Sequence, residues 1–359
     1  MCGIFFDISK AFDRAWHYGI VFKLVKFGVP RYLVRFVKYF LSDRSFRVLI
    51  NEFITIIFLI FCGVPQGSVL GPLLFLACIM DIPLASTKSL CYSALFADDL
   101  CCIFIFKNST VAVQKRMREY LESLVDWLFK WRLKMNVTKC CYTIFSRGGR
   151  NGIKFDLQMN GKSIPYTPNP TFLGITFDER LTFKVHVENL RVRALKRLNI
   201  IKIFSHKSWH LNKTTLINIY RSLMGSIFDY SFFIVACCSN LSLDRIQTTQ
   251  NRAIRCIYRL KWDSPTDQLF PLSGVLPLRA RFLQLGARYL LKSLLFKNPF
   301  TALLVSEYKR SFSEITKKNK LSTPLCYFLS VMGLVYCFFV VLVLNILKFR
   351  LMLIDLLSW

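Results

Sequence analysis

The chain has 359 residues, with 49 Lys and Arg against 21 Asp and Glu, and its formal net charge is +28. This excess favours a phosphate-rich partner, because Lys and Arg that neutralise phosphates release condensed counterions. The 13 cysteines form no Cys-x-x-Cys pair and no Cys/His cluster with zinc spacing. That pattern excludes the common zinc-binding classes and indicates free thiols in a reducing compartment.

Strand-like and helix-like segments alternate through the first part of the chain. An apolar run ends at Asp7, and two β-prone apolar runs flank Asp98-Asp99, which is therefore predicted at the turn of a hairpin. The other predicted elements, in chain order, are a helix over Arg31–Leu41, strands over Ser45–Asn51 and Phe53–Phe61, a helix over Val69–Met80, and a helix over Thr110–Trp131. This alternation predicts the α+β fold class.

Three motifs in this part of the chain stand in an order typical of a nucleic-acid polymerase palm. They are Asp7 at a strand end, the loop Gly63–Ser68, and the pair Asp98-Asp99. A carboxylate on one strand can meet a pair at the tip of a neighbouring hairpin, as two metal ions about 3.5–4 Å apart require. Read alone, each motif has an ordinary interpretation as a helix cap or a turn. Their joint occurrence points to metal-dependent nucleotidyl transfer.

The motifs resemble the reverse transcriptase of non-LTR (LINE-type) retrotransposons, most closely the jockey-type elements of insects. The segments that carry this resemblance are Phe6–His17, Gly63–Phe75 and Phe96–Asp99, then Trp131–Asn136 with Lys139, Phe172–Asp178 with His186, Tyr220–Tyr230, and Gln247–Arg255. The likeness covers roughly residues 4–290. A group II intron maturase is the runner-up family, and the Gly63–Phe75 run favours the LINE type.

The resemblance implies roles residue by residue. Asp7 and Asp98 would be the principal ligands of Mg²⁺ or Mn²⁺, with Asp99 as a supporting catalytic carboxylate. The residues implied in substrate binding are Phe12, Gln66, Gly67 and Lys139. Leu173 and Gly174 would position the primer terminus. The implied partners are an RNA template, a DNA primer, the RNA–DNA hybrid and deoxynucleoside triphosphates.

Several of these residues also have an ordinary structural interpretation. Phe12 fits a core position on a helix over Ala11–Trp16, and Lys139 fits a solvated surface lysine. Leu173 and Gly174 fit a strand followed by its turn. These alternatives stay open on the sequence alone.

The resemblance also implies a domain plan. A palm over residues 1–182, with the fingers largely missing, precedes a basic helical thumb and C-terminal region over 183–320. From Lys184 to Lys320 there are 24 Lys and Arg against 7 Asp and Glu, a net charge of +17 over 137 residues. Apolar spacing in Leu216–Leu223 and Leu243–Ile257 predicts helices there. Such a region suits a grip on duplex backbone, although a solvated basic surface is the ordinary interpretation.

The carboxyl end has a different character. Residues 321–347 carry no charged side chain over 27 positions, which is long enough for a helix to cross a bilayer. They are predicted as a hydrophobic, transmembrane-type segment that would add a membrane partner, and residues 348–359 form a tail. Because the resemblance gives no reason for such a segment, translation past the family's usual end into unrelated sequence is the origin that we favour.

Three functional hypotheses follow. The first is an RNA-directed DNA polymerase acting in the nucleus or in a cytoplasmic ribonucleoprotein. Because Met1 stands only six residues before Asp7, we expect a truncated copy with weak or no activity, and poor cover over Phe5 and Phe6. The second hypothesis is a non-catalytic nucleic-acid-binding remnant. The third is a tail-anchored membrane protein with a vestigial polymerase core.

Overall fold

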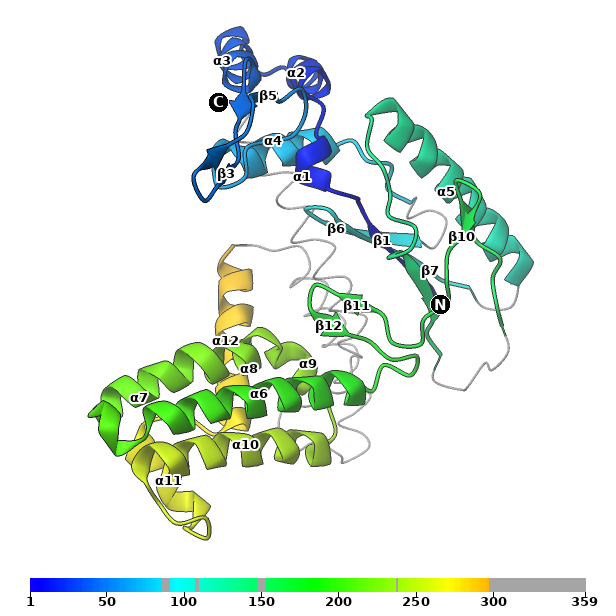
Figure 1. Cartoon of the computed structure of the whole chain (residues 1–359). Helices are drawn as coiled ribbons and strands as arrows, with labels where there is room; N and C mark the ends of the chain where they lie inside the picture. Colours follow the sequence, from blue (N-terminus) through cyan, green and yellow to red (C-terminus); the bar gives the residue numbers. More distant parts are fainter. Residues whose placement is uncertain (86–90, 107–109, 147–152, 237, 297–359) are drawn as a thin grey trace. The chain divides into compact units, whose positions relative to one another are not determined.

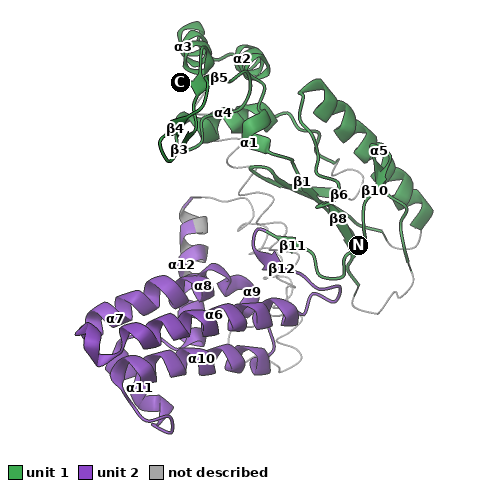
Figure 2. Ribbon diagram, in the orientation of Figure 1, with its two compact units in different colours: residues 1–172, 342–359 green, residues 173–341 purple. Residues whose placement is uncertain are grey.

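The computed structural model describes residues 1–85, 91–106, 110–146, 153–236 and 238–296 (Figure 1). Among them, residues 1–172 form a first compact unit and residues 173–296 belong to a second one (Figure 2). The predicted apolar segment 321–347 lies outside the described residues. Within the described ranges, no helix combines the length and the apolar character needed to cross a membrane.

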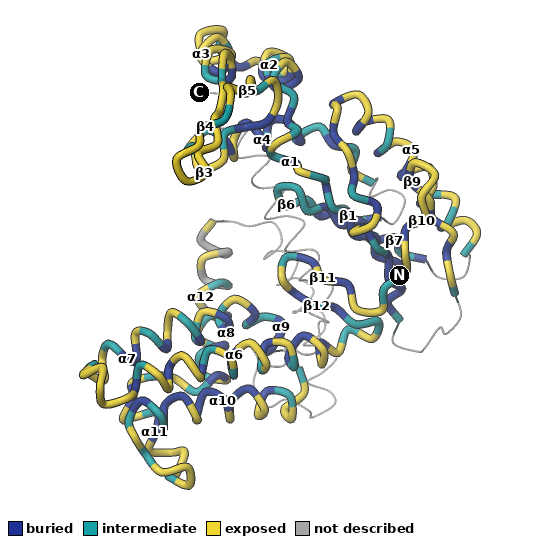
Figure 3. The backbone as a smooth tube through the Cα atoms, in the orientation of Figure 1, coloured by how far each residue is buried: buried dark blue, intermediate teal, exposed yellow. Residues whose placement is uncertain are grey.

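The first unit is built on an antiparallel sheet of four strands in the order β6-β7-β1-β8. These strands are β1 Cys2–Asp7, β6 Cys91–Phe96, β7 Asp99–Phe104 and β8 Cys141–Ile144. Because β1 pairs with both β7 and β8, its apolar run is buried almost throughout (Figure 3). The predicted strand ending at Asp7 and the predicted hairpin at Asp98-Asp99 are both present.

Helices accompany this sheet, and the longest of those in the first unit packs over one of its faces. Their bounds are α1 Ala11–Arg14, α2 His17–Lys26, α3 Arg31–Leu41, α4 Leu70–Ile79 and α5 Thr110–Lys130. Along α5 the buried residues recur at helical spacing and share one core with alternate residues of β1. Three of these helices, α3, α4 and α5, match predicted ranges to within one residue at each end. Those ranges were Arg31–Leu41, Val69–Met80 and Thr110–Trp131. The predicted Ala11–Trp16 helix is shorter, because the chain turns at Ala15 and Trp16 before α2 begins.

The aromatic residues of β1 are well covered. Phe5 is 5% exposed and packs against Phe172, with ring centroids 5.9 Å apart. Phe6 is 3% exposed and packs against Tyr120 of α5. The expectation that Phe5 and Phe6 would lack cover is therefore wrong. The sequence reasoning missed that a strand late in the first unit and a helix of the same unit close over the two faces of β1.

The region predicted as two strands over 45–61 is more broken than expected. Its strands are β2 Ser45–Phe46, β3 Leu49–Ile50, β4 Phe53–Ile54 and β5 Phe58–Leu59, which pair as β2 with β5 and β3 with β4. All eight residues of these strands are exposed. A two-stranded ribbon with no packed face has little to hold long regular pairing, so the ladder is interrupted.

Shorter strands complete the first unit and begin the second. A hairpin joins β9 Gln158–Met159 to β10 Lys162–Ser163. Asn160 and Gly161 form its turn with φ of 51° and 70°, the left-handed values that an Asn-Gly turn favours. After β11 Thr171–Phe172 and β12 Ile175–Thr176 the chain becomes helical.

The second unit is helical. Its elements are α6 Lys184–Phe204, the 3₁₀ turn η2 Lys207–Trp209, α7 Lys213–Tyr220, the π-helical turn η3 Arg221–Gly225, α8 Ser226–Tyr230, α9 Phe232–Ala236, α10 Asn240–Tyr258, α11 Thr266–Ser273 and α12 Leu278–Leu295. α6 and α10 pack side by side and share one apolar core with α7 and α8. The helices predicted at Leu216–Leu223 and Leu243–Ile257 are present.

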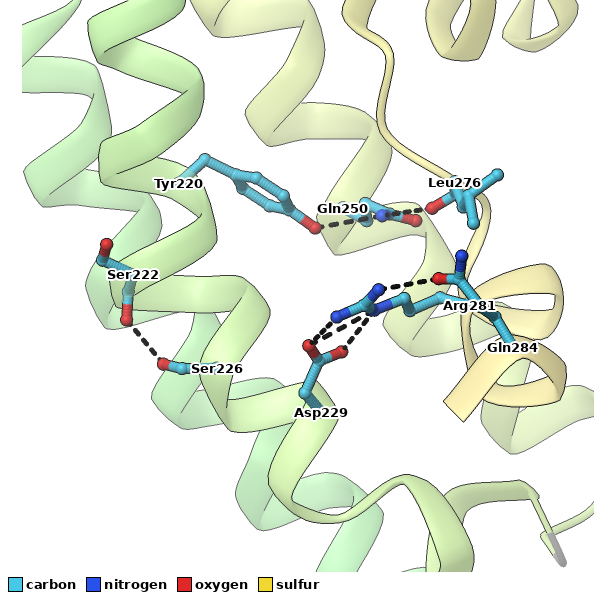
Figure 4. A network of polar contacts seen from close by, with 8 residues as sticks. All are labelled: Tyr220, Ser222, Ser226, Asp229, Gln250, Leu276, Arg281 and Gln284. Atoms are coloured by element: carbon cyan, nitrogen blue, oxygen red, sulfur yellow. Dashed lines mark hydrogen bonds and ion pairs between the residues drawn. The ribbon is translucent and has the colours of Figure 1, made fainter. Parts of the chain in front are cut away.

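Polar contacts among buried and half-buried side chains join these helices (Figure 4). The amide of Gln250 on α10 donates to the hydroxyl of Tyr220 and to the carbonyl of Leu276, each at 3.0 Å. Arg281 of α12 makes a paired contact with the carboxylate of Asp229 on α8, the closer N–O distance being 2.7 Å. Charge-assisted pairs of this geometry are stronger than neutral hydrogen bonds. These contacts link α10 to α7 and to the segment before α12, and they link α8 to α12.

A buried lysine joins the helices of the first unit. Lys23 of α2 is 0% exposed, and its ammonium donates to the carboxylate of Asp81 and to the carbonyl of Cys78. The same ammonium lies 3.7 Å from the ring centroid of Trp131, and Trp127 donates to Asp81 at 3.1 Å. Burial lowers the pKa of Lys23, whereas the hydrogen bond to Asp81 raises it. The charge is tolerated because every side of it has a partner.

This arrangement predicts unequal effects of removing its two charges. Asp81→Ala should lower the free energy of unfolding by roughly 3 kcal/mol, because it leaves a buried ammonium without its counterion. Lys23→Met should cost much less, since the carboxylate of Asp81 retains contact with water and with Trp127. Urea unfolding followed by tryptophan fluorescence would measure both. Equal losses would show that the ion pair does not govern this packing.

Candidate active site

The pairing of β1 with β7 sets three aspartates together. Asp7 stands directly opposite Asp99 in the antiparallel register. Phe96 also pairs with Asp99, so Ala97 and Asp98 form the two-residue turn between β6 and β7. Ala97 adopts φ of 50°, the left-handed value that such tight hairpin turns require. The predicted meeting of a strand carboxylate with a hairpin pair is thus present in the fold.

Strand alternation decides which face carries these side chains. Phe6 and Leu100, the pair next to Asp7 and Asp99 in the ladder, are buried in the core on the helix-covered face. Because successive side chains of a strand point to opposite faces, Asp7 and Asp99 belong to the other face. All three aspartates are half-buried. They can therefore meet a ligand from solvent.

The three carboxylates influence one another electrostatically. Burial raises the pKa of Asp99, and the negative charges of Asp98 and Asp7 raise it further. Lys139, a predicted site residue, places its ammonium 3.9 Å from the Asp7 carboxylate and remains 68% exposed. The backbone N–H of Asn136 donates to the carbonyl of Asp7 at 2.8 Å, which ties the Lys139 segment to the end of β1.

The carboxylate oxygens of Asp7, Asp98 and Asp99 are suitable ligands for a divalent cation such as Mg²⁺. Within the described ranges, no group of three or more His, Cys, Asp or Glu side chains is arranged to hold a metal ion by itself. Mg²⁺ does not need such a cage, since it is commonly bound through one or two carboxylates and the phosphates of a substrate. Burial, and then the charges of Asp98 and Asp7, disfavour the charged form of Asp99, so a cation between these carboxylates would stabilise it.

The predicted Gly63–Ser68 loop is fastened to the segment that follows β1. Gly63 donates its N–H to Ala15 and Val64 donates to the carbonyl of Phe12, each at 2.8 Å. Gly63 has φ of 93°, and a Cβ there would lie 2.8 Å from the carbonyl oxygen of Asp13. Only glycine fits this position. The backbone bonds therefore hold the two motifs against each other.

Side chains of the two motifs also meet. The amide of Gln66 donates to the carboxylate of Asp13 at 3.0 Å. Gly67 is exposed, with φ of 82°. Phe12 is half-buried and stacks on Phe75 of α4, with ring centroids 4.4 Å apart. The sequence reasoning assigned no role to Asp13, and the contact that reveals it spans 53 positions.

The remaining predicted residues, Leu173 and Gly174, belong to the second unit. They have φ of 48° and 72° and form the turn between β11 and β12. The hydroxyl of Tyr230 donates to the carbonyl of Leu173 at 2.7 Å. The sequence implied no role for Tyr230, which ends the Tyr220–Tyr230 segment and lies 57 positions from Leu173.

His186 supports the same part of the chain. Its Nδ1 accepts from the N–H of Thr176 at 3.2 Å, and its Nε2 lies 3.2 Å from the hydroxyl of Ser231. The ring is 2% exposed. Burial, with a smaller effect of the Arg193 charge, lowers the pKa of His186 to about 4.

The buried His186 predicts acid sensitivity of the second unit. In the unfolded chain the imidazole of His186 takes up a proton near pH 6.5, whereas in the folded unit it does so only near pH 4. The stabilisation present above pH 6.5 is therefore lost as the pH falls from 6.5 to about 4. The loss should reach about 1.4 kcal/mol per pH unit. Hydrogen exchange of α6 amides would measure it, and His186→Asn, which retains an acceptor for Thr176, should flatten the profile. An unchanged slope in the variant would assign the sensitivity to other groups.

Comparison with known proteins places these features in a family. Residues 1–177 match the family described as reverse transcriptase (RNA-dependent DNA polymerase). The chain is 31% identical over 272 residues to the RNA-directed DNA polymerase from mobile element jockey of Drosophila melanogaster, covering 72% of this chain and 28% of that protein. It is 30% identical over 266 residues to the probable RNA-directed DNA polymerase from transposon BS of the same species, with 71% and 28% covered.

Residues 1–177 therefore belong to the reverse transcriptase family. Their relatives are the polymerases of jockey and other non-LTR elements, as the motifs predicted. The chain spans 28% of the length of these relatives. Among solved structures, a telomerase from Candida albicans in complex with a fragment of telomeric RNA shares 12% identity with a TM-score of 0.29, covering 76% of this chain and 49% of that one.

Proposed function

We propose that this chain is an RNA-directed DNA polymerase of a non-LTR retrotransposon, which joins deoxynucleotides to a primer hydroxyl on an RNA template. The proposal depends above all on the pairing of β1 with β7. This pairing places Asp7 directly opposite Asp99, next to the hairpin turn that contains Asp98. Membership of residues 1–177 in the reverse transcriptase family supports it. The ten described cysteines are free thiols, which suits action in the nucleus or a cytoplasmic ribonucleoprotein.

In this proposal Asp7 and Asp98 hold the divalent ions, Mg²⁺ or Mn²⁺, and Asp99 supports them. Bound there, the ions would lower the pKa of the primer hydroxyl and neutralise charge on the leaving pyrophosphate. Lys139 adds a positive charge on the nucleotide side of Asp7 and suits contact with the triphosphate. Its exposure supports that role, because a mobile ammonium can move from the carboxylate to a bound phosphate.

Phe12, Gln66 and Gly67 complete the proposed nucleotide site. Stacking on Phe75 holds the Phe12 ring in place, as a side chain must be held if it is to exclude a ribose 2′-hydroxyl. Asp13 engages the NH₂ group of Gln66 and so leaves its carbonyl oxygen for a base or a sugar. Gly67 lets a nucleotide approach the backbone closely.

The metal carboxylates give the direct test of this proposal. Asp98→Asn should lower primer extension on an RNA template by several orders of magnitude, since a neutral amide is a poor ligand for a hard dication. Any extension should require Mg²⁺ or Mn²⁺. Asp126→Asn, which changes an exposed aspartate on α5 of the same unit, is the matched control and should leave the rate unchanged. Equal extension by wild type and Asp98→Asn would remove Asp98 from the site.

We further propose that the second unit binds the RNA template and its RNA–DNA hybrid through their backbones. Arg245 and Arg252 of α10, and Arg259 at its C-terminal cap, are exposed and stand seven residues apart. The charge of Arg245 acts on Glu188 near the start of α6, and Arg259 reaches the carbonyl of Ser205 after its end. The arginine row therefore follows α6 along its length and offers charge to successive phosphates.

Salt dependence would test this row. The logarithm of the affinity for an RNA–DNA duplex should fall linearly with the logarithm of the salt concentration. The affinity should depend little on the nucleotide sequence. Arg252→Gln should reduce the magnitude of this salt-dependence slope by about one, because one phosphate contact is lost. Lys162→Gln, at an exposed lysine of the first unit, serves as the control. A slope that Arg252→Gln leaves intact would place the binding surface elsewhere.

A further inference from the structure

We propose that Tyr230 is a positioning residue for the turn at Leu173 and Gly174, holding it in the form that receives the end of the primer. This inference rests on the proposed polymerase function and on the primer-positioning role that the family resemblance implies for Leu173 and Gly174. It gives a role to a residue for which the sequence implied none, and the contacts of that residue identify the role.

The turn needs support from outside itself. Leu173 and Gly174 both adopt left-handed φ, at 48° and 72°. Glycine takes this conformation freely, but a residue with a Cβ does so at a cost, so Leu173 would leave it unless contacts hold it there. The neighbours Phe172 and Ile175 are buried, whereas Leu173 is half-buried and Gly174 exposed. The strained part of the hairpin is therefore the part that a ligand can reach.

Tyr230 supplies the missing contacts. Its hydroxyl donates to the carbonyl of Leu173 at 2.7 Å. Its ring lies beside Gly174, where an added Cβ would be 3.7 Å from the tyrosine Cε1. Tyr230 is 65% exposed, so it contributes little to the core of the second unit. Its contacts serve the turn more than the stability of the helices.

The helical frame fixes Tyr230 from both sides. Asp229, the residue before it, is held by the paired contact with Arg281 (Figure 4). Ser231, the residue after it, lies 3.2 Å from the His186 ring, which in turn accepts from the N–H of Thr176 just beyond the turn. Three consecutive residues thus connect the hairpin to α6 and α12. A turn held at this many points can present a constant backbone surface to a sugar and phosphate.

The test uses the full chain and a DNA primer with a photoreactive nucleotide at its 3′ end, annealed to RNA. Tyr230→Phe removes the hydroxyl and keeps the ring. Crosslinking to residues 171–176, mapped by mass spectrometry, should fall by about 2- to 10-fold, the factor that one net hydrogen bond represents. Overall affinity for the duplex should change by less than about twofold, since backbone contacts dominate it. A merely structural role would not separate these two readouts.

The control is Tyr32→Phe, which removes the hydroxyl of a 71% exposed tyrosine on α3 and should leave the crosslinking pattern unchanged. Crosslinking to the turn that Tyr230→Phe does not reduce would overturn the role of Tyr230 alone. Duplex binding with crosslinks only outside 171–176 would overturn the assignment of the turn. Failure of the wild-type chain to bind the duplex would overturn the proposed function, and this inference with it.

Discussion

The antiparallel pairing of β1 with β7 is the interaction on which the rest of the candidate site depends, because it sets Asp7 opposite Asp99. A slip of one residue would turn Asp7 toward the helix-covered face and expose Phe6 instead. The apolar residues at the alternate positions prevent that slip, since Ile4, Phe6 and Leu100 are buried in the core. The placement of the carboxylates is thus a consequence of hydrophobic burial on the opposite face.

Polar contacts have different structural roles in the two units. In the first unit, Lys23 and Asp81 hold α2 against the tryptophans of the α5 end. In the second, Asp229, Ser231 and His186 frame an exposed tyrosine at a strained turn. The contacts of Lys23 and Asp81 fix helices of the first unit against one another. The second arrangement fixes a surface element, which is where a substrate contact needs rigidity.

Sequence reasoning found the parts of the site that local pattern determines. Asp7, Asp98 and the hairpin follow from apolar runs and turn chemistry, and the family resemblance led to Lys139, which lies beside Asp7. It missed Asp13 and Tyr230, because their contacts join residues 53 and 57 positions apart and leave no local signal. It was wrong about cover over Phe5 and Phe6 for the same reason. Which segment closes over a strand is decided by tertiary packing.

The proposed site requires Asp7 and its neighbours to bind divalent cations together with a nucleotide. Paramagnetic resonance of Mn²⁺, titrated into the full chain with a deoxynucleoside triphosphate present, tests this binding without requiring polymerisation. We expect bound Mn²⁺, beyond that held by free nucleotide, in the wild type and in Asp126→Asn, and its loss in Asp7→Asn. Mn²⁺ binding that Asp7→Asn leaves unchanged would show that Asp7 does not hold the cations.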